Sequence, residues 1–335
     1  MQVAFYSTKR YDRQFFDQAL EQSSSPVTLT YLEPKLTEQT ACLAEGYPVV
    51  CAFVNDDLNR SVLECLAKNG TSLIALRSAG FNHVDLEVAA ELGLAIVRVP
   101  AYSPHSVAEH TVGLMLTLNR RIYRAYNRVR EDNFTLDGLM GFDFHGSTVG
   151  IIGTGKIGYC VAQILQGFGC HILGYDAYPN AQFRALPQAE YVDLATLYAR
   201  SETITLHCPL MAETHHLINE SAIAQMKPGV MLINTSRGAL LDTSAVIQGI
   251  KQKTIGYLGL DVYEQEDQLF FEDWSEDIID DDNFQLLQSF PNVVITAHQA
   301  FFTRNALTSI AETTVQNIAE FAQGEALTNE VCLPA

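Results

Sequence analysis

The stretch that decides the fold is TVGIIGTGKIG, residues 148–158. It begins as a short apolar run typical of a buried strand and continues into three glycines with the spacing G-x-G-x-x-G. A helical pattern follows, and a second apolar run, His171 to Tyr175, ends at Asp176. This order predicts a βαβ unit of a parallel α/β sheet: a strand, a glycine turn, a helix, a second strand and an acid.

Each glycine of this turn is expected to serve a different structural purpose. Gly153 permits the tight turn after the strand, Gly155 lets the backbone approach a pyrophosphate, and Gly158 lets the helix pack closely on the sheet. The N–H groups at the helix start, including the main chain of Lys156 and Ile157, would hold the phosphates. We interpret the stretch as a dinucleotide site. The alternative is a glycine turn without a ligand.

The acid that ends the second strand indicates which dinucleotide binds. The Asp176 carboxylate could accept hydrogen bonds from both hydroxyls of the adenosine ribose, whereas a 2′-phosphate would meet a like charge. Residues 177–180 offer no Arg or Lys to accommodate that phosphate. The sequence therefore favours NAD over NADP as the cofactor.

The same alternation of apolar runs and amphipathic stretches extends over the whole chain. Because 335 residues exceed what one core usually serves, we expect an α/β fold of two domains with parallel sheets. Single long helices are expected over residues 103–130 and 303–321. Strands are expected at residues 3–6, 27–32, 49–54, 73–76, 95–99, 148–152, 171–175, 203–207, 230–234, 257–260 and 293–297.

Composition excludes several classes of protein. The chain is 47% hydrophobic and 18% charged, which is typical of a globular protein, and its net charge of −18 disfavours nucleic acid as a partner. No apolar run is long enough to span a membrane, and the N-terminal segment turns polar within a few residues, so we expect neither a membrane anchor nor export. Seven scattered cysteines without a C-x-x-C pair predict no disulfide framework and a reducing, cytoplasmic location.

One segment carries much of the negative charge. Residues 264–282 hold ten carboxylates and no Lys or Arg, and we interpret them as a solvated loop, since their spacing fits no EF-hand calcium loop. His215 and His216 lie in a polar loop without any further ligand pattern, so no metal site is expected there.

Several predicted strands end in polar residues, and the carboxyl ends of parallel strands meet at one crevice. Together with the glycine turn, these segments strongly resemble the NAD-dependent D-2-hydroxyacid dehydrogenase family over nearly the whole chain, with the closest likeness to its fermentative D-lactate subgroup. The segments that carry the resemblance are residues 77–80, 99–104, 234–238, 260–266 and 296–301.

The residue types at these strand ends suit hydride transfer to a 2-oxo acid. An Arg offers a planar fork for a carboxylate, a His can donate a proton to a developing alkoxide, and a Glu can keep that His protonated. The resemblance implies that Arg237 binds the substrate carboxylate, that His298 is the acid/base, and that Glu266 raises the pKa of His298. The plainer alternatives are a surface ion pair for Arg237 and a structural role for His298.

The resemblance also assigns residues around the substrate. Ser78, Ala79 and Gly80 match the loop whose backbone N–H groups contact the substrate carboxylate, and Tyr102 and Phe301 match residues that line a small side-chain pocket. Around the cofactor it implies a supporting acid near the nicotinamide and a set of strand-end residues. These are Asp261, His207, Cys208, Pro209, Thr235 and Ser236. A purely structural role stays open for His207.

The resemblance further implies how the domains are divided. Residues 1–101 and 299–335 would form the substrate domain, and residues 102–298 would form the NAD-binding Rossmann domain inserted in it. Hinges are expected near Tyr102 and Gln299. The helix over 103–130 would contribute to the subunit interface of a homodimer or homotetramer.

The expected reaction is the reversible reduction of pyruvate by NADH to D-lactate. The long acidic and aromatic segment Leu269 to Trp274 and the sequence Thr-Ala-His298 favour the D-lactate subgroup over relatives that act on glycerate. Two alternatives stay open: a broader dehydrogenase of branched or aromatic 2-oxo acids, and an NAD(H)-binding corepressor without turnover.

Overall fold

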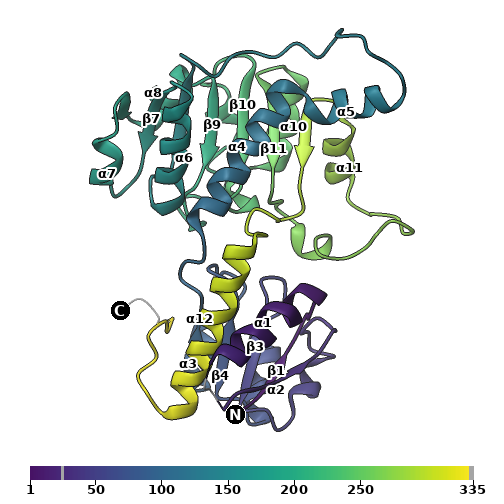
Figure 1. Cartoon of the computed structure of the whole chain (residues 1–335), viewed down its shortest axis with the longest axis vertical. Helices are drawn as coiled ribbons and strands as arrows, with labels where there is room; N and C mark the ends of the chain where they lie inside the picture. The colour runs from purple at the N-terminus through teal and green to yellow at the C-terminus, as the bar shows by residue number, and fades with distance from the viewer. Residues whose placement is uncertain (24–25, 332–335) are drawn as a thin grey trace. The chain divides into compact units, whose positions relative to one another are not determined.

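The computed structural model describes residues 1–23 and 26–331 and divides the chain into two compact units (Figure 1). One unit comprises Met1–Ser103 and the chain from Phe302, and the other comprises Pro104–Phe301. The crossings predicted from the sequence, at 101/102 and 298/299, lie two and three residues before these boundaries. Both units are layers of helices on a parallel sheet, which confirms the predicted α/β class.

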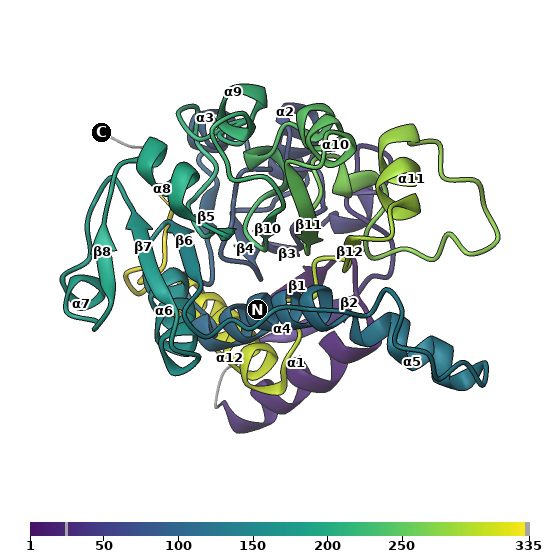
Figure 2. The ribbon, with the colours of Figure 1, turned by 90° about the horizontal axis from the view of Figure 1, so that it is seen from above.

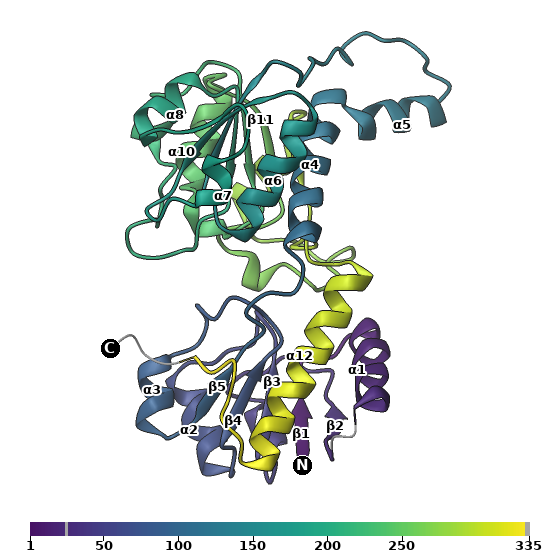
Figure 3. The same ribbon diagram turned by 60° about the vertical axis from the view of Figure 1, so that its left-hand side comes forward.

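The first unit has a five-stranded parallel sheet of order β2-β1-β3-β4-β5. Helices α2 (Arg60–Lys68) and α3 (Leu86–Glu91) lie on one face, and α1 (Arg10–Gln22) and α12 (Arg304–Gln323) lie on the other (Figure 3). The single turn η1 spans Ala41–Ala44. The strands are β1 (Gln2–Phe5), β2 (Thr28–Tyr31), β3 (Val49–Ala52), β4 (Leu73–Leu76) and β5 (Ala95–Val97).

The second unit has a seven-stranded parallel sheet of order β12-β11-β10-β9-β6-β7-β8. The strand order reverses between β6 and β9, and this switch point is where such sheets open a ligand crevice. The strands are β6 (Thr148–Ile152), β7 (His171–Tyr175), β8 (Ala189–Tyr191), β9 (Thr203–Leu206), β10 (Val230–Asn234), β11 (Ile255–Leu260) and β12 (Val293–Ile295).

Helices cover both faces of this sheet, as Figure 2 shows. Neighbouring strand residues point to opposite faces, so Ile151 packs with α4 and α6, while Ile152 packs with the helices of the other face. This two-sided burial explains the continuous apolar runs in the sequence. The helices are α4 (Pro104–Arg120), α6 (Lys156–Gly167), α7 (Ala181–Arg184), α8 (Leu194–Arg200), α9 (Glu220–Ile223), α10 (Thr243–Lys251) and α11 (Asp282–Ser289), with short turns η2 (Gly238–Leu240) and η3 (Glu266–Gln268).

The expectation of one helix over residues 103–130 is wrong. The helix ends at Arg120, Arg121 takes a left-handed φ of 48°, and a separate helix, α5 (Ile122–Arg130), extends away from the sheet of its unit (Figure 1). The physical reason is the end of the core: Leu118 is buried, whereas Ile122 and Tyr126 are more than half exposed. Strand β8 was not expected either.

Two further observations bear on chemistry and location. None of the helices in residues 1–23 and 26–331 is long and apolar enough to cross a membrane. Six cysteines are free thiols, of which Cys42 is exposed and Cys208 is buried, while Cys332 lies outside the described residues. Burial raises the pKa of the Cys208 thiol to about 11, so this thiol is un-ionised near neutral pH.

Candidate active site

The glycine turn joins β6 to α6 as predicted. A Cβ on Gly153, whose φ is 93°, would lie 2.4 Å from the Cys208 nitrogen, and a Cβ on Gly158 would lie 2.0 Å from the Gly153 oxygen. Gly155 differs, because within the described chain nothing lies within 4 Å of its Cβ position. It is the N-cap of α6, so open space borders the free N–H groups of Lys156 and Ile157. This cradle fits a dinucleotide pyrophosphate.

Asp176 follows β7 and is bonded to the same turn. Its Oδ2 accepts hydrogen bonds from the backbone nitrogen of Thr154 at 2.6 Å and from Thr154 Oγ1 at 3.1 Å, and its Oδ1 accepts one from the Tyr178 nitrogen at 2.8 Å. A carboxylate oxygen has two lone pairs, so Oδ1 retains one acceptor site. The carboxylate is therefore fixed beside the turn and can still accept a bond from a ribose hydroxyl.

His207 directly follows β9, in a position unsuited to proton donation. Its Nε2 lies 3.0 Å from Thr205 Oγ1, and its Nδ1 is buried without a partner among the described residues. Burial lowers the pKa of His207 to about 3, so the ring is neutral near pH 7. The next carbonyl, that of Cys208, accepts a hydrogen bond from Ser236 Oγ at 2.8 Å and so connects the ends of β9 and β10.

The remaining strand-end residues of this group have structural partners. The carbonyl of Pro209 accepts a hydrogen bond from Thr214 Oγ1 at 2.7 Å, and Thr235 Oγ1 lies 2.8 Å from Thr111 Oγ1 on α4. These contacts position the backbone that follows β9 and β10. The structure thus brings the cofactor residues named from the sequence to one end of the sheet.

Arg237 lies at the end of β10 in a turn that Asn234 holds. Asn234 Nδ2 donates to the Arg237 carbonyl at 2.7 Å, and Asn234 Oδ1 accepts from the Ser236 nitrogen at 3.0 Å. Arg237 Nη1 donates to the Ser236 carbonyl at 2.6 Å. No carboxylate within residues 1–23 and 26–331 forms an ion pair with Arg237, so its guanidinium can still bind one.

His298 and Glu266 form a hydrogen-bonded pair. His298 Nδ1 lies 2.7 Å from Glu266 Oε1, and the Tyr263 nitrogen donates to Glu266 Oε2 at 2.8 Å. Both side chains of the pair are about five-sixths buried, with 17% and 16% of their surfaces exposed. Because the carboxylate occupies Nδ1, the opposite ring nitrogen, Nε2, remains for a reacting group.

Asp261 holds the backbone around His298. Its main-chain oxygen accepts a hydrogen bond from the His298 nitrogen at 2.7 Å, and its carboxylate accepts from the Gln299 and Ala300 nitrogens at 2.9 and 2.8 Å. His298 has a left-handed φ of 49°, which a non-glycine residue adopts at a cost in free energy. Burial alone would raise the pKa of Asp261, but hydrogen bonds from His110 and Thr296 outweigh it and lower that pKa.

The substrate residues expected in the first unit lie after β4 and near Ser103. Ser78 Oγ donates to the Gly80 carbonyl at 2.8 Å, and Arg98 Nη1 donates to the Ala79 carbonyl at 2.8 Å. These bonds fix the carbonyl groups of the loop within its own unit. Tyr102 belongs to this unit and is half-buried, whereas Phe301 belongs to the second unit, where its ring centre lies 6.4 Å from that of His298.

Two residues near His298 were missed by the sequence analysis. His110 on α4 has its Nε2 3.1 Å from Thr296 Oγ1 and 3.3 Å from Asp261 Oδ1. The sequence could have indicated that His110 faces inward, because it falls on the apolar helical spacing that includes Val107 and Leu114. Phe271, with φ of 69°, places its ring centre 5.9 Å from that of His298, and no local pattern predicts this contact.

Comparisons with known proteins show which proteins the chain is similar to. Residues 112–300 match the model of the NAD-binding domain of D-isomer specific 2-hydroxyacid dehydrogenases. The D-lactate dehydrogenase of Escherichia coli (strain K12) is 54% identical over 331 residues, 99% of this chain and 100% of that one. The solved pyruvate reductase of Chlamydomonas reinhardtii is 45% identical over 98% of each chain, with a TM-score of 0.91. A D-lactate dehydrogenase from Aquifex aeolicus, solved with NAD and lactic acid, is 35% identical, covers 99% of this chain and 100% of its own, and has a TM-score of 0.86.

Proposed function

The chain belongs to the D-isomer-specific 2-hydroxyacid dehydrogenases, and from this premise we propose that it is an NAD-dependent D-lactate dehydrogenase. The family resemblance inferred from the motifs is confirmed, and so is NAD as the cofactor, since residues 112–300 are a NAD-binding domain of this family. The proposed reaction is pyruvate + NADH + H⁺ to D-lactate + NAD⁺, with lactate oxidation as its reverse.

The observation that carries the proposal is the pair of His298 Nδ1 and Glu266 Oε1 at 2.7 Å. The bound nicotinamide supplies the hydride. His298 donates the proton to the substrate oxygen from Nε2, and the Glu266 carboxylate favours the protonated imidazole that this step needs. In lactate oxidation the neutral ring accepts the same proton.

Arg237 is proposed to bind and orient the substrate carboxylate through two parallel N–H donors. Its turn is fixed by Asn234, so the guanidinium starts from a defined backbone. For the first unit we propose that the backbone N–H groups of residues 78–80 contact the same carboxylate. Tyr102 and Phe301 are the proposed wall around the methyl group of pyruvate. Residues 1–101 with 299–335 would then serve the substrate, and residues 102–298 the cofactor.

NADH is proposed to be preferred to NADPH because the Asp176 carboxylate would repel a 2′-phosphate. We also propose a homodimer or homotetramer in which α5 contributes to the interface, since this helix exposes Ile122, Tyr126 and Val129 on one side. A cytoplasmic location is proposed from the scattered free thiols.

A panel of 2-oxo acids tests the proposed function. Initial rates with NADH and with NADPH are measured for pyruvate, 2-oxoisocaproate and phenylpyruvate, and the product is resolved by chiral chromatography. Pyruvate should have the highest kcat/KM and yield the D-isomer, with NADH preferred. A preference for the bulky acids would favour the broader dehydrogenase, and NADH binding without turnover would favour the corepressor.

A further inference from the structure

Two adjacent histidines and a distant glutamate meet on the second unit. His215 and His216 follow β9, whereas Glu264 follows β11, yet one ligating atom from each of the three lies within 4.8 Å of the others. The sequence alone does not reveal this third ligand, because Glu264 is 48 residues away from His216 along the chain. The mechanism proposed above uses none of these side chains.

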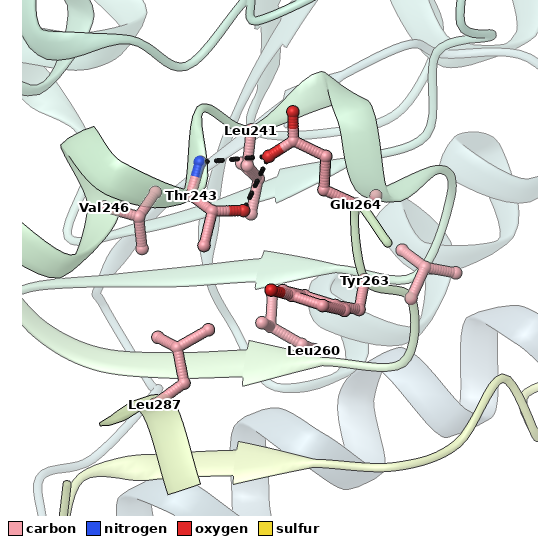
Figure 4. Close-up of a pocket in the computed structure, with 9 residues that line it drawn as sticks. Leu241, Thr243, Val246, Leu260, Tyr263, Glu264 and Leu287 are labelled. Atoms are coloured by element: carbon pink, nitrogen blue, oxygen red, sulfur yellow. Dashed lines mark hydrogen bonds between the residues drawn. The ribbon is translucent and has the colours of Figure 1, made fainter. Parts of the chain in front are cut away.

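The glutamate is held so that one oxygen faces the histidines. Glu264 Oε2 accepts a hydrogen bond from Thr243 Oγ1 at 2.7 Å, while Oε1 lies 2.6 Å from His216 Nε2. Figure 4 shows the bonds to Thr243 beside a small pocket lined partly by Tyr263 and Leu287.

One histidine of the pair is hydrogen-bonded and partly buried, and the other is exposed. The His216 nitrogen donates to the Ala239 carbonyl at 2.9 Å, which fixes the backbone of His216. The His215 ring is stacked on that of His216 with centres 4.0 Å apart, and its side chain is exposed. An exposed imidazole can change rotamer without disturbing a core.

We propose that His215, His216 and Glu264 form a binding site for a divalent transition-metal ion, for which Zn²⁺ is the probe. Imidazole and carboxylate are the ligands that Zn²⁺ accepts, at distances of about 2.0 to 2.2 Å. Mg²⁺ and Ca²⁺ are disfavoured because they take oxygen ligands. Glu264 is one of the ten carboxylates of residues 264–282, and their combined negative charge attracts cations to the second unit.

Two adjustments accompany the binding of the ion. His216 Nε2 and Glu264 Oε1, 2.6 Å apart, must separate, because two ligands that each lie about 2.1 Å from one tetrahedral ion are roughly 3.4 Å apart. The ligating nitrogen of the exposed His215 must approach them by a change of rotamer. The fourth position of a tetrahedral ion would then hold water. Bound metal would connect the loop after β9 with the segment that precedes Glu266.

Isothermal titration with ZnCl₂, without substrate or NADH, tests the site. The full chain should bind Zn²⁺ with a saturable stoichiometry. In His215→Ala and in Glu264→Gln, either the stoichiometry should fall by one equivalent or the affinity for Zn²⁺ should be at least tenfold weaker than in the parent. His171→Ala is the matched control, because His171 is also exposed and lies outside the cluster. It should bind like the parent.

Unchanged Zn²⁺ binding in His215→Ala would overturn the proposal, and so would the absence of saturable binding in the parent. If Glu264→Gln fails to fold, His215→Ala decides alone, since the His215 side chain is exposed. Zinc held by the exposed Cys42 would persist in every variant and is thereby distinguished. The readout needs no turnover, so its failure is separate from failure of the proposed dehydrogenase activity.

Discussion

The glycine turn of residues 153–158 and the histidine corner, formed by Asp261, Glu266 and His298, both contain left-handed backbone. In the turn the conformation belongs to Gly153, a residue without a Cβ, at φ of 93°. In the corner it belongs to His298, at φ of 49°, and bonds from Asp261 hold it in place. One conformation is inherent in the local sequence, whereas the other depends on a residue 37 positions away. Remote substitutions should therefore disturb the corner more than the turn.

The largest expected effect is on the histidine itself. His298→Ala removes the proposed proton donor and should lower kcat about a thousandfold in both directions, since general acid–base catalysis contributes roughly 10² to 10⁴. The Kd of NADH, measured by fluorescence titration, should stay within twofold, because the glycine turn is separate. Loss of NADH affinity would show that the two regions are not independent.

Arg237→Lys should have the next largest effect. A Lys cannot reproduce the two parallel bonds to a carboxylate, so kcat/KM for pyruvate should fall about a hundredfold, or roughly 3 kcal/mol. Arg200→Lys is the matched control, because Arg200 forms an exposed ion pair with Glu190 and should leave kinetics unchanged. A normal KM for pyruvate with weakened NADH binding would instead place Arg237 on the cofactor.

Asp261→Asn tests how the corner is held. The free energy of unfolding should decrease by about 2 kcal/mol at pH 7, because hydrogen bonds to a buried charged group are weakened. The folded-state pKa of Asp261 is lowered, so its stabilisation is present above the unfolded pKa of about 3.9 and is lost as the pH falls through the folded pKa. Urea titrations at pH 7 and pH 3.5 should show the gap between parent and variant narrowing in acid. A constant gap would contradict this role.

Two glycine substitutions separate folding from binding in the turn. Gly155→Ala should leave the melting temperature nearly unchanged, because its Cβ meets open space, while the Kd of NADH rises about tenfold through one lost close approach. Gly153→Ala should lower the melting temperature instead, since its Cβ would clash with the Cys208 backbone. If both variants have the melting temperature of the parent, the packing around Gly153 and around Gly155 does not differ as proposed.

The smallest expected effect is that of the residue bonded to His298. Glu266→Gln keeps an oxygen that can accept a bond from His298 Nδ1 but removes the charge, so kcat for pyruvate reduction should fall only about tenfold. The Kd of NADH should stay within twofold. Initial rates and fluorescence titration measure the two constants, and an unchanged kcat would exclude Glu266 as the residue that holds His298 in place.

The turn was predictable from the sequence because its glycines, strand and acid follow one another within about thirty residues. The break at Arg121 was not, because the apolar spacing continues to Ile122, whereas the core already ends after Leu118. The bonds around His298 join β11 to residues after β12, and no local pattern encodes such a register. Glu264 illustrates the same limit, since its partners at 215 and 216 meet it only through the sheet.

The positions of two side chains allow a distance within the protein to be followed by fluorescence energy transfer. Its single tryptophan, Trp274, lies in the second unit, and the exposed thiol of Cys42 lies in the first. Cys51, Cys160, Cys170 and Cys208 are buried, and so react slowly with reagents that need a thiolate. Because Cys65 is partly exposed, the label is placed in a Cys65→Ser, Cys332→Ser background, where a fluorophore on Cys42 would accept energy from Trp274. Its emission would report any change in the distance between Trp274 and residue 42 when NADH and pyruvate are added.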